Sequence, residues 1–371
     1  MTAEPGSAAP SSTEAPATGP SSSELRAIFD RTLSDWSHLR ERASPAVRSL
    51  RIAGVDVDVV VAGEELERIL LPAFEGLTPA GGPPRGTVGA WDAAATGVDF
   101  FRLSDLGRDL PFQCMIRRDG RPIAELEWPT EHLLRTGDRV SGTHLLAVSR
   151  ASELSPWEAG APLRRQLSWV LSPEVLFVHA AAVGSADGAA LIMGESGAGK
   201  SSTSLACLRA GMGFLSDDYC LVRDDPPVVH RLHATARLLD EDVAHVDDFL
   251  EPVVRGAALL DVDPGAKSLF LLQASRPQQM VSEAPVRVVL VPQQGGDDAP
   301  RLEPMRAAEV LRVVAPKALW QMSLDPAAEL GALRRLVSAV PCYRLVLSPD
   351  RRANPPLVQE ALDRAPVRSD S

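Results

Sequence analysis

The chain has 371 residues, of which 45% are hydrophobic and 23% are charged. This length allows two domains, or one large domain with an appendage, and the composition is that of a globular protein rather than of a disordered, fibrous or membrane chain. The 38 basic and 49 acidic residues leave a formal net charge of −11, which argues against a nucleic-acid partner because phosphate contacts need clustered Lys and Arg.

The N-terminal segment 1–23 is rich in Ala, Pro, Ser, Thr and Gly, which predicts a disordered tail rather than a signal peptide. No apolar run approaches the roughly 20 residues of a membrane span. We therefore expect a cytoplasmic protein with no membrane partner, and the sequence leaves homo-oligomer formation open. Buried free thiols are expected at four cysteines, which show no zinc-ligand or disulfide spacing: Cys114, Cys207, Cys220 and Cys342.

Residues 24–155 are predicted to form a mixed α/β or β-rich region of unknown role. Apolar residues recur at spacings of three and four from Leu25 to Trp36, which predicts an amphipathic helix over 24–42. Alternating apolar residues on both sides of Gly54 predict a pair of strands over 47–61. A helix over 64–74, a loop over 78–86 and further short strands up to residue 149 follow.

From residue 156 to about residue 366 the predicted helices and strands alternate, which is typical of an α/β domain. A helix over 201–209 ends at Gly211, because glycine readily takes the left-handed conformation that closes a helix. The other predicted helices are 163–171, 307–314, 326–339 and 356–364, and the predicted strands are 175–183, 189–193, 214–215, 219–222, 286–291 and 342–347.

The strongest motif is Gly194–Ser201, which matches the phosphate-loop pattern G-x-x-x-x-G-K-S/T between a predicted strand and a predicted helix. Backbone N–H groups of such a loop point at phosphate oxygens, and the helix adds its positive N-terminal end. Lys200 is suited to the β- and γ-phosphates, and the Ser201 hydroxyl to Mg²⁺. The residues expected to bind ATP here are Gly194, Glu195, Ser196, Gly197, Ala198, Gly199, Lys200, Ser201 and Ser202.

The pattern alone does not separate a kinase from a GTPase or a transporter ATPase. Asp217 and Asp218 follow the loop after one helix, whereas the strand 286–291 ends without a carboxylate. One carboxylate can accept the proton of an acceptor hydroxyl, and a second can hold the metal or its water. Both reach the phosphate only if the backbone turns between them. A solvated turn is the alternative interpretation.

Three further residues are candidates, each with an ordinary alternative. His179 lies on the strand that enters the site, where it is either catalytic or a core residue. Lys267, one of three lysines in an arginine-rich chain, and Arg237 are candidate phosphate or substrate clamps, or surface cations. The acidic segments 240–242 and 247–248 are predicted to form a solvated face that could receive a basic peptide.

In this order, the segments His179–Val183, Leu191–Ser202 and Gly211–Tyr219 resemble the catalytic core of HPr kinase/phosphorylase and its stand-alone relatives, whose nucleotide site is similar to that of phosphoenolpyruvate carboxykinase. The resemblance implies a P-loop kinase core over 156–366 that needs ATP and Mg²⁺ and phosphorylates a hydroxyl, usually of a serine. It implies catalytic roles for His179, Lys200, Asp217 and Asp218, and a metal site at Ser201, Asp217 and Asp218.

The chain also departs from that family. Ser202 stands where bacterial HPr kinases carry an acidic residue, Glu251–Gly256 is only a distant counterpart of the Glu-x-Arg-Gly segment, and residues 25–155 do not resemble the regulatory domain. We therefore expect an acceptor other than HPr, either a peptide or another protein, and the net charge favours a basic one. The alternatives are a kinase of a small-metabolite hydroxyl, with a closed pocket built by the N-terminal region, and a nucleotide-switched binding module without catalysis.

Overall fold

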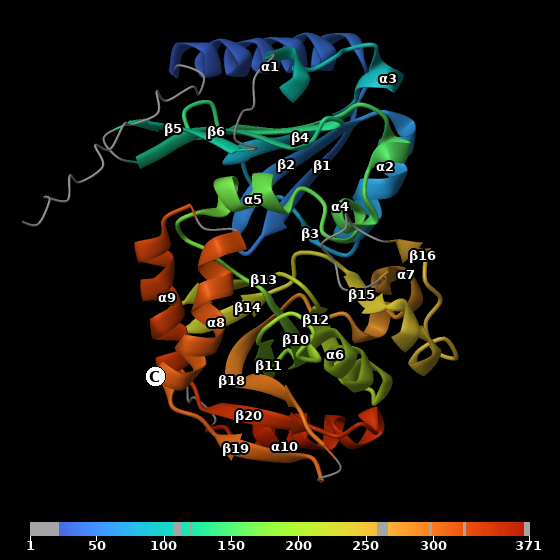
Figure 1. Cartoon of the computed structure of the whole chain (residues 1–371), viewed down its shortest axis with the longest axis vertical. Helices are drawn as coiled ribbons and strands as arrows, with labels where there is room; N and C mark the ends of the chain where they lie inside the picture. Colours follow the sequence, from blue (N-terminus) through green and yellow to red (C-terminus); the bar gives the residue numbers. More distant parts are fainter. Residues whose placement is uncertain are drawn as a thin grey trace, which may run out of the picture.

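The computed structural model describes residues 22–106, 113–118, 121–257, 266–296, 299–321 and 324–366. The tail expected over 1–23 lies outside these residues, except for its last two positions, which belong to the first helix. The chain forms a mixed α/β structure with two large mixed sheets and a small third sheet (Figure 1). The expected α/β class is therefore confirmed at this level.

The first sheet has eight strands in the order β3-β1-β2-β4-β8-β7-β6-β5. Strands β2, β4 and β8 are parallel neighbours, and the other pairs are antiparallel. The predicted β-rich region and its strand pair about Gly54 are confirmed. The strands are β1 (Ala46–Ile52), β2 (Val55–Ala62), β3 (Thr78–Pro79), β4 (Gly86–Asp92), β5 (Gln113–Arg118), β6 (Arg121–Thr130), β7 (Leu133–Asp138) and β8 (Thr143–Val148).

Helices cover both faces of the first sheet. Helix α1 (Ser22–Arg42) packs on one face, where the Trp36 and Trp91 rings lie 5.8 Å apart. The other face packs against α2 (Glu64–Leu70) and α5 (Arg164–Leu171). Every residue of α5 is buried, because this helix lies between the first sheet and the second (Figure 1). Short helices α3 (Ala93–Thr96) and α4 (Pro156–Gly160) complete this part, and the domain boundary expected at 155/156 stays a prediction.

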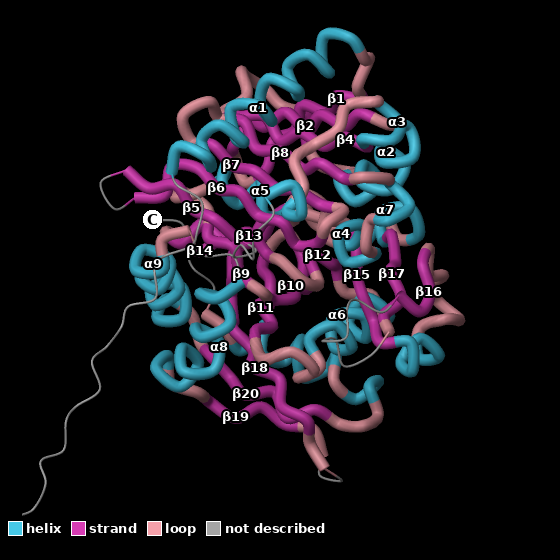
Figure 2. The backbone as a smooth tube through the Cα atoms, turned by 45° about the horizontal axis from the view of Figure 1, so that its top comes forward, coloured by secondary structure: helices cyan, strands magenta, loops and turns pink. Residues whose placement is uncertain are grey.

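The second sheet has the strand order β12-β10-β11-β18-β14-β13-β9, with β20 beside β18 and β19 beside β20 (Figure 2). Strand β18 runs parallel to both β11 and β20. The strands are β9 (Leu176–Val178), β10 (Ala180–Ser185), β11 (Gly188–Met193), β12 (Gly213–Ser216), β13 (Cys220–Asp224), β14 (Pro227–His230), β18 (Glu283–Gln294), β19 (Arg301–Pro304) and β20 (Cys342–Leu347).

One face of the second sheet packs against α8 (Ala307–Gln321) and α9 (Pro326–Ala339), and the other against α6 (Lys200–Arg209) and α10 (Pro355–Arg364). Helices α6, α9 and α10 fall within one residue of their predicted bounds, whereas α8 continues to residue 321, beyond its predicted end at 314. A small sheet beside α6 has the strand order β15 (Thr235–Leu239), β17 (Lys267–Leu271), β16 (Val254–Ala257). Helix α7 (Leu272–Ser275) directly follows β17 in the chain.

The strand predicted over 175–183 is interrupted in the structure. It breaks at His179 into β9, which pairs with β13, and β10, which pairs with β11 and β12. The break lies beside the bend at Asp217 and Asp218 that separates β12 from β13, because Val178 pairs with Cys220 and Ala182 pairs with Ser216. The two interruptions bring the histidine and the aspartate pair together.

Two expectations about the rest of the chain can be compared with the structure. Among the described helices, none has the length and apolar character needed to cross a membrane. The four cysteines are free and buried, as predicted.

Candidate functional site

The loop between β11 and α6 has the strand–loop–helix arrangement that the phosphate-loop pattern requires. It curls at Gly197 and Gly199, whose φ angles of 78° and 102° favour glycine. A Cβ atom on Gly199 would also lie 2.6 Å from Leu347 Cδ1. Helix α6 begins at Lys200, whose buried ammonium donates hydrogen bonds to the carbonyls of Gly194 (3.0 Å) and Glu195 (2.8 Å). The lysine is therefore held over the start of the loop.

A cavity of about 410 Å³ opens beside this loop and brings most of the predicted site residues together. Three predicted binding residues do not line it: Gly194 is buried below the loop, Glu195 is exposed, and Ala198 is half-buried. The predicted residues that line it are His179, Ser196, Gly197, Gly199, Lys200, Ser201, Ser202, Asp217, Asp218, Arg237 and Lys267.

Asp217 is a buried carboxylate between α6 and β15. Its Oδ1 accepts a hydrogen bond from the Ser204 hydroxyl (3.0 Å), and its Oδ2 accepts one from the backbone N–H of Arg237 (3.0 Å). Ser201 also donates to this carboxylate. Burial raises the pKa of Asp217, and the neighbouring Asp218 charge adds to the increase, although the hydrogen bonds oppose it.

Asp218 lies in the opposite electrostatic environment. Its Oδ2 accepts a hydrogen bond from the Arg237 guanidinium, and its Oδ1 is 3.4 Å from His179 Nδ1. Burial would raise the pKa of Asp218, but the positive charges of Arg237, His179, Arg164 and Lys200 outweigh it, so the pKa falls below its ordinary value. Asp218 is therefore an ionised carboxylate at the wall of the cavity.

The sequence did not predict several residues that line the same cavity. Gln294 is the last residue of β18. Ser348 and Asn354 belong to the turn after β20, where the Asn354 side chain accepts from the Ser348 N–H (2.8 Å) and donates to the Ser348 carbonyl (3.2 Å). Arg351 forms an ion pair with Asp242 across the cavity mouth. Ser348, Arg351 and Asn354 come from a turn that carries no sequence motif, so nothing in the sequence pointed to them. Gln294 lies just beyond the long apolar stretch 286–291, which is the one sequence feature near any of these residues.

The acidic segments 240–242 and 247–248 are exposed at four of their five residues, although three of their carboxylates have partners. Asp242 is paired with Arg351, Asp248 with Arg209, and Asp240 accepts a hydrogen bond from the Ser268 hydroxyl (2.5 Å). The expected solvated acidic face is therefore confirmed at Asp240, Glu241, Asp247 and Asp248, which are exposed, and is wrong at Asp242, which is half-buried in its ion pair with Arg351.

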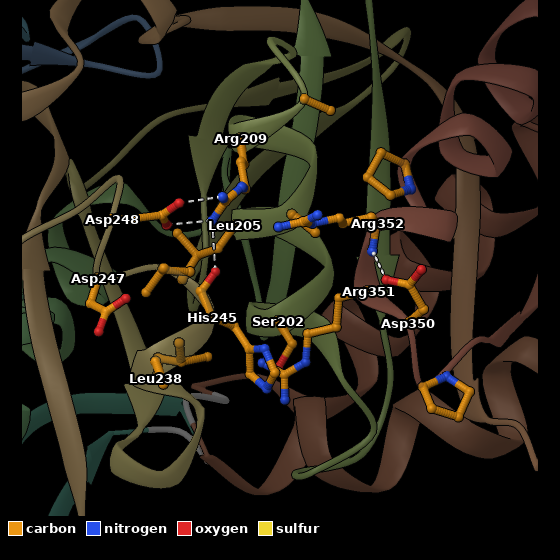
Figure 3. A pocket seen from close by; sticks show the side chains of 16 residues that line it. Ser202, Leu205, Arg209, Leu238, His245, Asp247, Asp248, Asp350, Arg351 and Arg352 are labelled. Atoms are coloured by element: carbon orange, nitrogen blue, oxygen red, sulfur yellow. Dashed lines mark hydrogen bonds and ion pairs between the residues drawn. The ribbon is translucent and has the colours of Figure 1, made fainter.

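A second cavity, of about 680 Å³, adjoins the first and shares Ser202, Leu238, Pro349 and Arg351 with it (Figure 3). It runs along α6 past Leu205 and Arg209. The Arg209 guanidinium is fixed by hydrogen bonds to the His245 carbonyl (2.9 Å) and the Asp248 carboxylate (2.6 Å). The two cavities therefore form one continuous depression along α6, polar at the loop and more apolar beyond it.

Magnesium needs few protein ligands when phosphate oxygens supply the rest. Within the described residues no cluster of three or more His, Cys, Asp or Glu side chains could hold a metal ion by itself. The hydroxyl of Ser201 and the carboxylate of Asp217 are, however, oxygen donors in contact with each other beside the loop. This donor set fits Mg²⁺ carried by a nucleotide.

Comparison with known proteins leaves the family of the chain open. No family model and no curated protein sequence matches it. The solved structure of the Hpr(Ser) kinase/phosphatase from Coxiella burnetii is similar over 51% of this chain and 93% of that one, with 13% identity and a TM-score of 0.26. A similarity of this size carries no argument about activity, so the predicted resemblance stays a prediction and the function is argued from the site itself.

Proposed function

We propose that the protein is an ATP-dependent kinase that transfers the γ-phosphoryl group to a hydroxyl, in the first place that of a serine in a peptide or protein. The observation that carries this proposal is that Lys200, Ser201 and the ionised Asp218 line one cavity. A glycine-rich loop alone would suit any nucleotide-binding protein. A carboxylate facing the same space adds the group that accepts the proton of a hydroxyl.

The proposed reaction is an in-line displacement. The acceptor oxygen bonds to the γ-phosphorus, the bond from that phosphorus to the bridging oxygen breaks, ADP leaves, and the acceptor proton passes to Asp218. Because the transition state of phosphoryl transfer is loose, positioning and electrostatics supply most of the acceleration, and an ionised carboxylate of modest basicity is sufficient. His179 contacts Asp218 and keeps the carboxylate oriented.

Lys200 and the loop N–H groups are assigned to the phosphate oxygens, and Ser201 with Asp217 to the metal ion. When bound with ATP, Mg²⁺ neutralises charge on the β- and γ-phosphates. Burial disfavours the negative charge of Asp217, and a nearby cation compensates for it. The two aspartates therefore have separate roles in this proposal, Asp217 at the metal and Asp218 at the acceptor.

We assign the nucleoside of ATP to the second cavity. The support is its position, because it begins at Ser202, directly after the residue assigned to the metal, and continues along α6. Its apolar walls, which include Leu205 and Leu238, suit a base better than a phosphate (Figure 3).

The walls of the first cavity favour a peptide or protein acceptor over a small metabolite. A metabolite kinase would need a pocket closed by the N-terminal region, yet no described residue before His179 lines this cavity. The ionised Asp218 favours catalysis over a nucleotide-switched binding module, since a sensor has no acceptor proton to remove.

Phosphotransfer can be tested with ATP, Mg²⁺ and separate peptide, protein and metabolite pools. We expect a mass increase of one phosphoryl group in the peptide or protein pool, which is lost in Lys200→Ala. Phosphorylated metabolites would instead indicate a kinase that acts on the hydroxyl of a small metabolite. Nucleotide-dependent partner binding without any phosphorylated product would indicate the binding module instead.

A further inference from the structure

The segment 156–164, which comprises α4 and the first residue of α5, lies in the connection between the two large sheets and supplies or contacts the arginines that surround Asp218. The Arg164 guanidinium lies 5.9 Å from the centroid of the Tyr219 ring, and that ring lies 5.6 Å from the His179 ring. Tyr219 directly follows Asp218 in the chain. Arg164 therefore packs against the aromatic residue beside the acceptor carboxylate.

The same segment also supports Arg237, the direct ion-pair partner of Asp218. A Cβ atom on Gly160 would lie 2.9 Å from Arg237 Cδ, so the stem of the arginine rests on the end of α4. Two hydrogen bonds fix β15 to the segment close by, from the Thr235 hydroxyl to the Gly160 carbonyl, and between His233 Nε2 and the Pro162 carbonyl (2.9 Å). Strand β15 is the strand that carries Arg237.

The segment is in turn held by buried ion pairs that come from the first sheet. Glu158 on α4 accepts from Arg164 (3.0 and 3.2 Å) and from Arg135 on β7, and Arg135 also contacts Glu127 on β6 (3.0 Å). The Arg135, Glu158 and Arg164 side chains are 8–10% exposed. In such surroundings an ion pair has a fixed geometry, because breaking it would leave an uncompensated buried charge.

We propose that residues 156–164 are a positioning element of the site, which holds Arg237 and Arg164 around Asp218 and is itself fixed by the first sheet through the chain Glu127–Arg135–Glu158. This inference rests on the proposed kinase function and gives residues 24–155 a role in it. The first sheet supplies no residue to the cavity, but it determines where two of the surrounding cations lie.

The chain offers a matched pair of variants to test this role. Arg135 and Arg165 both form buried ion pairs between the first sheet and the α4–α5 region, with side chains 10% and 9% exposed, but only Arg135 binds the segment 156–164. Arg165 binds Glu125, which also accepts a hydrogen bond from the Trp169 ring N–H on α5, and no described contact joins Arg165 to Asp218 or Arg237. Arg165→Met therefore reports the structural cost of losing a buried guanidinium, whereas Arg135→Met adds the loss of positioning.

We expect Arg135→Met to lower kcat about 10- to 100-fold, since misplacing a reacting group by about 1 Å has an effect of this size. The KM for ATP should stay within about threefold, because the phosphate loop is untouched, and Arg135→Lys should restore most of the rate. Arg165→Met should lower Tm by a similar amount but leave kcat within about threefold. Equal kcat losses in the two Met variants at equal Tm would overturn the proposal.

Two further measurements keep the test decisive. Gly160→Ala retains every charge but adds a methyl group against Arg237, and we expect the same fall in kcat at constant KM for ATP. Hydrogen exchange of the backbone over 235–239 needs no activity: it should accelerate in Arg135→Met and not in Arg165→Met. If the wild type transfers no phosphoryl group, the kinase proposal fails, while exchange still decides whether the first sheet holds β15. Identical exchange in both variants would refute that coupling.

Discussion

Asp217 and Asp218 are neighbours in the sequence, yet their carboxylates lie in opposite electrostatic environments. Asp217 is buried among Ser201, Ser204 and a backbone N–H group, and its pKa is raised. Asp218 lies beside the Arg237 guanidinium, and its pKa is lowered. The bend between β12 and β13 causes this difference, because it lets consecutive side chains reach the same cavity from different sides.

The first prediction concerns stability against pH in protein free of divalent cations. Above the ordinary pKa of 3.8, unfolded Asp217 loses its proton before folded Asp217 does, so this group makes the free energy of unfolding fall as pH rises. Asp217→Asn removes this dependence. Its free energy of unfolding relative to the wild type should therefore increase from pH 3.8 upward in urea titrations. A difference that is constant with pH would contradict the raised pKa.

The second prediction separates backbone strain from nucleotide binding at three glycines with positive φ. Gly197→Ala and Gly211→Ala place a methyl group in open space, so each should cost about 1–2 kcal/mol in the free energy of unfolding. Gly199→Ala should cost more, because its methyl group meets Leu347. Calorimetry should show weaker Mg·ATP binding for the two loop variants only. Equal weakening by Gly211→Ala, which lies at the far end of α6, would count against a phosphate-binding role for the loop.

The third prediction tests the nucleoside assignment. Ala206 is a half-buried residue of α6 that lines the second cavity but not the first. Ala206→Phe should weaken Mg·ATP binding about tenfold or more, equivalent to about 1.4 kcal/mol, by filling that cavity. Binding of tripolyphosphate, which has no base, should be unchanged. Loss of both ligands together would place the nucleoside elsewhere or indicate a damaged loop.

The fourth prediction concerns Lys267, a half-buried residue of β17 that lines the first cavity. A hydrogen bond to a charged group contributes about 1.5–3 kcal/mol, so Lys267→Ala should lower kcat/KM for ATP about 10- to 100-fold. Lys267→Arg, which keeps the charge, should lose less. Steady-state kinetics identical to those of the wild type would show that Lys267 takes no part in binding.

Local sequence signals predicted the parts of the site that lie close together in the chain. The glycines of the phosphate loop and Lys200 shape the turn in which they lie, and Gly211 closes the helix directly before it. Because each acts on backbone next to it in the chain, the local sequence pattern was enough to predict its geometry. The requirement that the chain turn between Asp217 and Asp218 followed from strand alternation, and the structure meets it with a bend.

The remaining parts of the site depend on contacts between distant segments. Arg164 contacts both Glu158 and the Tyr219 ring, and no periodicity in the segments that carry these residues signals either contact. The break at His179 arises because the two halves of one apolar run pair with different strands. The walls of the second cavity likewise come from α6, the 3-10 helix Asp240–His245 and the turn after β20.

The most direct test of the kinase account compares phosphoryl transfer by the wild type, Asp218→Asn and the exposed control Asp187→Asn. With ATP, Mg²⁺ and a peptide or protein acceptor pool, the wild type and Asp187→Asn should form phosphoserine at equal rates. Asp218→Asn should be about 10²- to 10⁴-fold slower, the usual contribution of a general base, while calorimetry still shows Mg·ATP binding. Wild-type rates in Asp218→Asn, or no phosphorylated product from a wild type that binds Mg·ATP, would contradict the account.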